Sequence, residues 1–156
     1  MFYHPLIFER MAIEVKIVNT SGNSLPQYAT EGASGVDLRA NIKLPISLKS
    51  LERNLVSTGF FIELPKGYEA QVRPRSGLAV KQGLTCLNSP GTIDSDYRGE
   101  IKVLLINLSG EEQIINPGER IAQLVLQQVE KIEWKEVTTL TETVRNAGGF
   151  GSTGKN

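Results

Sequence analysis

Residues 112–129 read Glu112-Gln-Ile-Ile-Asn-Pro-Gly-Glu-Arg-Ile-Ala-Gln-Leu-Val-Leu-Gln-Gln-Val129, and this stretch decides the fold class. It contains two strand-like runs, Glu112–Ile115 and Arg120–Val129, on either side of the turn sequence Asn116-Pro-Gly118. Proline fixes the negative φ that the first central residue of a turn needs, and glycine readily adopts the positive φ of the second. Short apolar runs bounded by such turn residues are typical of β-strands. The stretch therefore predicts β structure.

The same alternation of apolar runs and turns extends over most of the chain. Ala12–Val18 alternates apolar and polar residues, which is the pattern of a half-buried strand. Further strand-like runs lie at Leu55–Leu64, Tyr68–Arg73 and Glu100–Leu108. One segment, Ser76–Gly83, favours a short helix, with Ser76 as its N-cap and Gly83 as its C-terminal stop. Many short strands with a single helix predict an all-β, jelly-roll-like domain.

The 156 residues are enough for one domain with its own core, which we expect over residues 11–143. Residues 1–10 precede Met11, a second possible start, and we treat them as an N-terminal extension. Residues 144–156 are rich in glycine and contain one large apolar side chain, Phe150. Such a segment buries too little surface to order itself, so we expect a flexible C-terminal tail.

Composition excludes several function classes. The 17 basic and 17 acidic residues balance, so the chain lacks the basic field of a typical nucleic-acid-binding protein. No apolar run is long enough to span a membrane. A single His (His4) and a single Cys (Cys86) exclude zinc sites, disulfide frameworks and paired-cysteine redox motifs. A free cysteine without an export signal indicates a cytoplasmic protein.

The groups left for catalysis are carboxylates, Arg, Lys and Tyr side chains and backbone amides, with a hard metal ion held through oxygen as an option. There are only three Asp residues, Asp37, Asp94 and Asp96, and all lie beside glycine-bounded turns. Asp94 directly follows a strand-like run, which suits a fixed general base. Asp also favours turns through bonds to the backbone, and we retain that interpretation for Asp96.

Two segments have the features of anion sites. In Arg73-Pro-Arg-Ser-Gly77, Arg75 and the Ser76 hydroxyl lie at the predicted helix start, where backbone N–H groups are free. The competing interpretation is a surface turn with solvated arginines. In the tail, the glycines, hydroxyls and cations around Phe150 suggest a lid that orders over a nucleotide.

Taken together, five segments closely resemble, in order, the five motifs of the trimeric dUTPases, the deoxyuridine triphosphate nucleotidohydrolases. The segments are Ala33–Leu38, Pro74–Ala79, Gly91–Gly99, Pro117–Leu124 and Arg145–Gly154. The resemblance runs from about Val15 to Lys155. It implies a jelly-roll-like dUTPase fold and a homotrimer with active sites at subunit interfaces. It also implies Mg²⁺-dependent hydrolysis of dUTP to dUMP and pyrophosphate, which produces dUMP and keeps uracil out of DNA.

The resemblance also implies roles for individual residues. Asp94 would activate the water that attacks the α-phosphorus, and Asp37 would hold Mg²⁺ through water. Tyr97 would lie against the deoxyribose and leave no room for a 2′-hydroxyl. The other implied substrate-binding residues are Arg75, Ser76, Gly77 and Gln123 for the phosphates; Asn88, Thr92, Ile93 and Lys102 for the base and sugar; and Arg145, Phe150, Gly151, Ser152 and Thr153 for the lid.

Two other functions stay open from the sequence. One is a dCTP deaminase, which shares the architecture, and the other is a non-catalytic nucleotide-binding or signalling trimer. The tail and the pair of Asp94 and Tyr97 favour the dUTPase, and a pure binder has no need of a water-activating acid. One departure is Ser89-Pro90, which does not match the apolar residues usual in the family.

Overall fold

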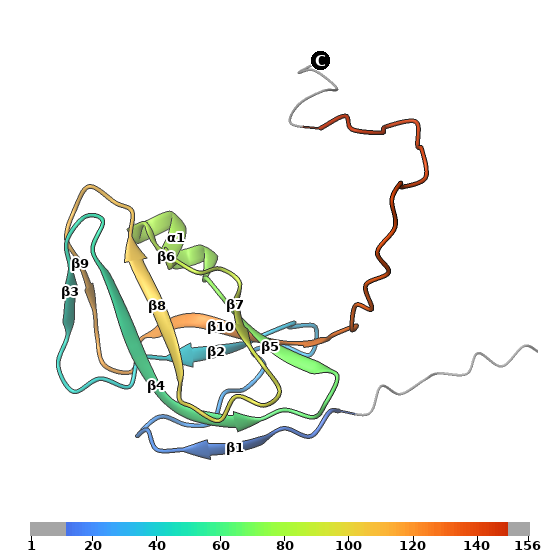
Figure 1. The fold of residues 1–156 in the computed structure, drawn as a ribbon. Coiled ribbons are helices and arrows are strands. Elements are labelled where there is room, and N and C mark those ends of the chain that lie inside the picture. Colours follow the sequence, from blue (N-terminus) through green and yellow to red (C-terminus); the bar gives the residue numbers. More distant parts are fainter. Residues whose placement is uncertain (1–11, 150–156) are drawn as a thin grey trace, which may run out of the picture.

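The computed structural model describes residues 12–149, and these form ten strands and one helix. The fold is mostly β, as the sequence predicts (Figure 1). In chain order the elements are β1 (Lys16–Asn19), β2 (Val36–Arg39), β3 (Ile46–Leu48), β4 (Arg53–Glu63), β5 (Tyr68–Arg73), α1 (Ser76–Gln82), β6 (Leu84–Cys86), β7 (Gly91–Ile93), β8 (Ile101–Asn107), β9 (Gln113–Ile115) and β10 (Arg120–Gln128).

Two four-stranded antiparallel sheets and one two-stranded sheet make up the domain. The first has the order β1-β4-β8-β6, the second β2-β10-β5-β7, and β3 pairs with β9. The predicted turn between β9 and β10 is confirmed, since Glu119 N donates to Asn116 O at 3.1 Å and Gly118 has a φ of 74°. Proline followed by a residue of positive φ is the type II turn that this sequence favours.

The core lies between the sheets and follows from the alternation of residues along the strands. On β8, Ile101, Val103 and Leu105 are at most 1% exposed, while the residues between them point outward. β10 and β2 contribute Ile121, Ala122 and Leu38 to the same cluster. This apolar contact holds the two sheets face to face and fixes which strand ends lie beside one another.

Three short strands were missed from the sequence, and one helix boundary was wrong. β2, β3 and β6 have three or four residues each, too few for a clear period. Ser76 is the first helical residue rather than the N-cap, because the Arg75 carbonyl already accepts a hydrogen bond from Ala79 N at 3.1 Å. The predicted stop at Gly83 is confirmed, with φ 65° in the left-handed region.

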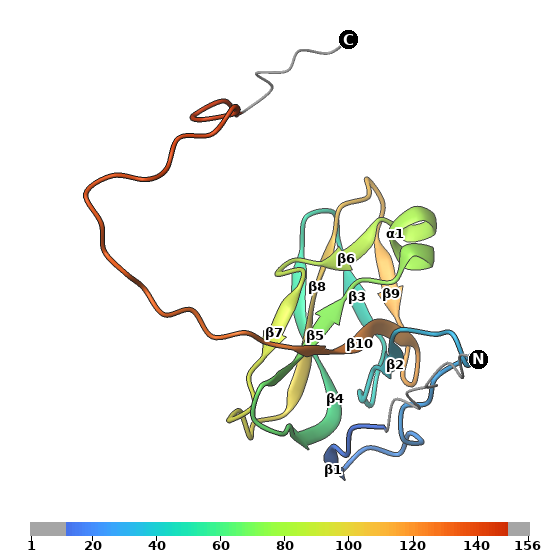
Figure 2. The ribbon, with the colours of Figure 1, turned by 90° about the vertical axis from the view of Figure 1, so that its right-hand side faces the viewer.

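The segment that follows β10 leaves the sandwich, and Figures 1 and 2 show it extending away from both sheets. Trp134 and Leu140 are each 86% exposed, and Ile132 is 69% exposed. Residues 130–149 therefore add nothing to the apolar core. Among residues 12–149, no helix is long and apolar enough to cross a lipid bilayer.

Candidate active site

Asp37 is the centre of the first group of predicted site residues, which we call the Asp37 cluster: Asp37, Arg75, Arg120 and Gln123. The carboxylate of Asp37 accepts from Arg75 Nε at 3.0 Å and from Arg120 Nη1 at 3.2 Å. Its side chain is only 20% exposed, so one carboxylate holds two guanidinium groups in a partly desolvated position. A polar cavity of about 350 Å³ lies beside Asp37 and Arg120.

Strand pairing brings this cluster together. On β10, Gln123 is paired with Asp37 of β2 on one side and with Arg73 of β5 on the other. Paired residues of neighbouring antiparallel strands project to the same face of the sheet, so these three side chains form a row. Arg75 follows that row through Pro74 and reaches back to Asp37.

The start of α1 lies next to the Asp37 cluster. Ser76 and Gly77, its first two residues, are both exposed. The N-cap, Arg75, is in an extended conformation and uses its side chain for Asp37 rather than for a capping bond. The first amides of an α-helix have no acceptor within the helix, so these amides are available to an anion that the arginines attract.

Asp94 lies in a second place, on the loop between β7 and β8, which we call the Asp94 loop (residues 94–100). Asp94 is exposed and lines an open cavity of about 540 Å³ together with Lys66, Glu69 and Lys131. The loop closes as a turn in which Tyr97 N donates to Asp94 O at 3.1 Å. Asp94 is thus held at a turn but remains open to water.

Tyr97 and Lys102 flank the same loop. The Tyr97 side chain is 43% exposed and its hydroxyl donates to the Glu100 carbonyl at 3.1 Å. Lys102 is exposed on β8, with its Nζ 3.6 Å from a Glu100 carboxylate oxygen. The structure therefore places both residues next to Glu100.

The residues predicted to read uracil lie on β7 and on the loop before it. β7 is the last strand of its sheet in the described part of the chain, so the edge away from β5 has backbone groups without a strand partner. Ile93 packs against the core and Thr92 is exposed. Asn88 folds over the start of β7, with its Nδ2 3.2 Å from the position that a Cβ on Gly91 would take.

The predicted lid residues are not brought to either place. Arg145 donates from Nε to its neighbour Gly148 O at 2.8 Å, on the segment that leaves the sandwich. Phe150, Gly151, Ser152 and Thr153 lie outside the described residues. Their assignment to the lid stays a prediction.

Comparisons with known proteins identify the family. The family model described as dUTPase matches residues 22–154. The deoxyuridine 5′-triphosphate nucleotidohydrolase of Fusobacterium nucleatum is 58% identical over 143 residues, which is 92% of this chain and 98% of that protein. The chain belongs to the dUTPase family.

Solved structures of dUTPases have the same fold. A mutant of the phage 80alpha dUTPase superposes with a TM-score of 0.79 at 23% identity, over 91% of this chain and 99% of that one. A mutant dUTPase of phage phi11 of S. aureus, described with a structural Mg(II) ion, superposes with a TM-score of 0.71 at 21% identity, over 83% of this chain and 99% of that one. The predicted dUTPase fold is therefore confirmed.

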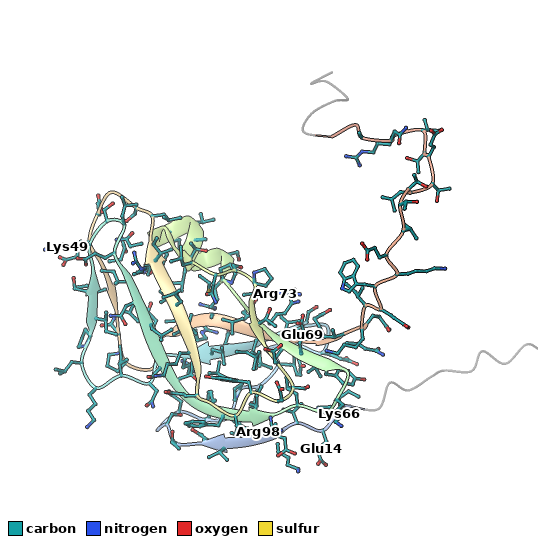
Figure 3. The ribbon with its side chains drawn as sticks, in the orientation of Figure 1. Glu14, Lys49, Lys66, Glu69, Arg73 and Arg98 are labelled. Atoms are coloured by element: carbon teal, nitrogen blue, oxygen red, sulfur yellow. The ribbon has the colours of Figure 1, made fainter. Side chains whose placement is uncertain are left out.

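The two groups of predicted site residues lie at opposite ends of β5. Ala70 is paired with Ile93, which places Asp94 beside the first residues of the strand, whereas Arg75 follows its last residue. Figure 3 labels Lys66 and Arg73, which mark these two ends. At about 3.3 Å per extended residue, the six steps along the backbone from Glu69 to Arg75 span about 20 Å. One chain therefore does not bring Asp94 to the Asp37 cluster.

The described part of this dUTPase does not gather many metal-binding side chains at one point. Residues 12–149 contain no group of three or more His, Cys, Asp or Glu side chains that could form a metal cage. Mg²⁺ keeps several waters and binds through one or two carboxylates together with substrate phosphates. The single carboxylate of the Asp37 cluster fits such an ion and does not fit a metal held by protein ligands alone.

Sequence reasoning missed two residues that the structure places at the site. Arg120 is not among the predicted site residues, although its side chain shares Asp37 with Arg75. Glu100 was not considered, although it contacts both Tyr97 and Lys102. The signal for Arg120 was its charge in an otherwise apolar strand, but only the strand register shows where it points.

Proposed function

We propose that the chain hydrolyses dUTP to dUMP and pyrophosphate at sites that are each built from more than one copy of the chain. The activity is that of the dUTPase family to which the chain belongs. The strand register supports shared sites, because it places Asp94 and Arg75 at opposite ends of β5, about 20 Å apart along the backbone. The base and the phosphate-binding arginines must act on the same triphosphate. In this proposal one copy of the chain supplies Asp94 to a site, and a second copy supplies the arginines.

Asp94 acts as the general base in this proposal. An exposed carboxylate held at a turn accepts a hydrogen bond from a water and removes its proton as the water attacks the α-phosphorus. The bond from the α-phosphorus to the bridging oxygen breaks, and pyrophosphate leaves with that oxygen. The reaction depends mostly on positioning and on stabilising negative charge, so the lack of a histidine is no handicap.

The Asp37 cluster binds the phosphates. In the described structure the charges of Arg75 and Arg120 are offset only by Asp37, which leaves one net positive charge among the three side chains. Guanidinium groups bind phosphate oxygens with two parallel hydrogen bonds, and the free amides at Ser76 and Gly77 add donors. Gln123 lies in the same row and reaches the same phosphates.

Mg²⁺ is the cofactor in this proposal, and Asp37 would hold it through water while the ion offsets the charge of the triphosphate. Asp37 has both of its oxygens on arginines, so ion and substrate compete with these contacts. Binding of the triphosphate supplies the anionic partner that lets the arginines turn from Asp37 to phosphate. Substrate and metal are therefore expected to bind more tightly together than separately.

The nucleoside lies against β7 and the Asp94 loop. The unpaired edge of β7 offers fixed backbone donors and acceptors to uracil, with Asn88 beside them. Cytosine presents a donor where uracil presents an acceptor, and a mismatched buried polar group costs about 1–3 kcal/mol. The Tyr97 ring excludes a 2′-hydroxyl, and Arg145 with Phe150, Gly151, Ser152 and Thr153 closes over the nucleotide as a lid.

A pyrophosphate-release assay with dUTP, dTTP, dCTP and UTP, each with and without Mg²⁺, tests the reaction. We expect release from dUTP with Mg²⁺ and little from the other three. Ammonia from dCTP without pyrophosphate from dUTP would instead indicate a deaminase. Binding of dUTP without either product would indicate a nucleotide-binding protein.

Subunit mixing tests whether sites are shared. Asp94→Asn and Arg75→Ala chains are each expected to be nearly inactive alone. After joint unfolding and refolding, activity returns if one site takes Asp94 and Arg75 from different copies, because some sites then receive both intact residues. A mixture as inactive as its components would show that each site is built from one chain. Sedimentation of the unmixed protein would show whether the copies number three.

A further inference from the structure

The Asp94 loop contains two predicted site residues, Asp94 and Tyr97, and strand pairing does not fix its conformation. Between the end of β7 at Ile93 and the start of β8 at Ile101 no residue pairs with a neighbouring strand. Residues that act on a substrate from a loop need a rigid scaffold behind them. The conformation of this loop must therefore be set by a few specific contacts.

Glu100 makes the contacts that join the loop to β4. Its Oε1 accepts from Gly59 N at 2.8 Å, and its Oε2 lies 3.4 Å from the Ser57 hydroxyl oxygen, which donates to it. The Lys102 ammonium is 3.6 Å from Oε2, and the Glu100 side chain is only 19% exposed. A carboxylate bound to a backbone amide in a partly desolvated position forms one of the stronger hydrogen bonds available.

The anchor point on β4 is itself fixed. The pairing of β4 with β8 shifts register between Ser57 and Phe60, and Gly59 has a φ of 74°. This bulge turns the Gly59 amide toward Glu100, while the Gly59 carbonyl accepts from Thr20 N at 2.8 Å. A Cβ on Gly59 would lie 2.7 Å from the Cβ of Ser21, so only glycine fits.

From this anchor, two contacts determine where the Tyr97 ring lies. The Glu100 carbonyl accepts from the Tyr97 hydroxyl at 3.1 Å. The ring covers Gly99, where an added Cβ would lie 2.5 Å from the ring carbon Cζ and close to the hydroxyl oxygen. Gly99 is not among the glycines of positive φ, so its missing side chain, rather than its backbone freedom, is what the structure uses.

We propose that Glu100 and Gly99 are positioning residues that hold the Tyr97 ring where it distinguishes deoxyribose from ribose. This inference rests on the proposed dUTPase activity and adds the residues on which its sugar selectivity depends. Neither residue needs to touch the nucleotide. Glu100 fixes the loop to the bulge of β4, and Gly99 leaves the space that the phenol ring fills.

Substitutions at each position separate positioning from general stability. Glu100→Ala removes the anchor, and Glu100→Asp keeps the charge but is too short to reach Gly59 N in the same way. Glu100→Gln keeps an acceptor for that amide and serves as the conservative variant. Gly99→Ala pushes the ring away, and Gly110→Ala is its matched control, since an added Cβ there meets nothing within 4 Å.

The experiment measures pyrophosphate release from dUTP and from UTP for each variant, and reports the ratio of the two kcat/KM values. Thermal midpoints are recorded in parallel. In Glu100→Ala, Glu100→Asp and Gly99→Ala we expect the ratio to fall by about tenfold or more, as for loss of a hydrogen bond to a charged group. In Glu100→Gln and Gly110→Ala we expect it to stay within about threefold of the wild type, which is within the effect of a weak neutral contact.

A merely structural role would lower kcat/KM for both substrates by the same factor and leave the ratio unchanged. An unchanged ratio in both Gly99→Ala and Glu100→Asp would overturn the inference, whatever the yield of Glu100→Ala. Failure of the wild type to release pyrophosphate from dUTP would instead overturn the proposed function. The two failures are therefore distinguishable.

Discussion

The two ends of β5 hold their site residues by different means. At the end that leads into α1, the Asp37 cluster is built from residues in register on neighbouring strands, so the sheet itself sets their spacing. At the other end, the Asp94 loop has no strand partner and depends on single contacts, such as Gly59 N to Glu100 at 2.8 Å. The end that we propose binds the phosphates is therefore fixed by the fold, while the end with the proposed base is fixed by individual side chains.

The largest effect is expected at the loop end. Asp94→Asn removes the base but keeps the size of the side chain, so turnover should fall by about 10²–10⁴-fold while dUTP still binds. Pyrophosphate release measures turnover, and calorimetry with a non-hydrolysable dUTP analogue measures binding.

Asp96→Asn is the matched control, because Asp96 lies in the same loop and is interpreted as a turn residue. Its turnover should stay close to that of the wild type. If Asp94→Asn retains full turnover, Asp94 has no part in the mechanism.

Deletion of residues 145–156 removes the proposed lid. The lid is proposed to close over the nucleotide that the residues at both ends of β5 bind. The exposed Arg145 and its neighbours contribute nothing to the core, so the thermal midpoint should change by less than about 2 °C. Activity should fall by about a hundredfold, since loss of a closing segment costs orientation and exclusion of water. A shortened chain with wild-type kcat/KM would refute the lid.

A smaller effect is expected from Arg75→Lys at the sheet end. Lysine keeps the charge but does not bind Asp37 and a phosphate with the planar fork of a guanidinium. We expect kcat/KM for dUTP to fall by about tenfold, equivalent to one charge-assisted hydrogen bond. Arg73→Lys is the control, because the Arg73 guanidinium binds Gln71 Oε1 at 2.7 Å rather than Asp37. Equal losses in the two variants would mean that Arg75 has no special role.

Cys86 on β6 lies at neither end of β5, and its reactivity monitors the fold independently of the proposed site. Burial raises the pKa of its thiol to about 11. Because the thiolate is the reactive form, iodoacetamide at pH 8 should modify the native protein about a hundredfold more slowly than the unfolded chain. Mass spectrometry of timed samples measures both rates, and comparable rates would show that Cys86 is accessible in the native state.

The raised pKa of the Cys86 thiol also makes the free energy of unfolding depend on pH. The folded state holds the thiol proton more tightly than the unfolded state, so this contribution is present below pH 9 and is lost as the pH rises from 9 toward 11. Cys86→Ala should remove that part of the pH dependence in denaturant titrations.

The sequence predicted the local features of the fold but not the contacts that depend on how distant strands pair. β5 was predicted with its observed bounds, and Asn116–Gly118 forms the predicted turn, because period and turn chemistry are local. The bond from Arg120 to Asp37 spans 83 residues and depends on the register of β10 with β2, which no local pattern encodes. The Glu100 anchor depends on a bulge in a strand that otherwise has an ordinary apolar pattern. The resemblance implies sites at subunit interfaces, and only the strand register shows that Asp94 and the Asp37 cluster lie at opposite ends of β5 within one chain.

The exposed segment after β10 also gives the protein an optical reporter. Trp134 is the only tryptophan of the chain, and in the described structure its indole is 86% exposed. The tryptophan emission of an isolated copy should therefore lie at the long wavelengths of a water-exposed indole. A shift to shorter wavelength with rising protein concentration would follow the burial of this segment against another copy, without any label or substrate.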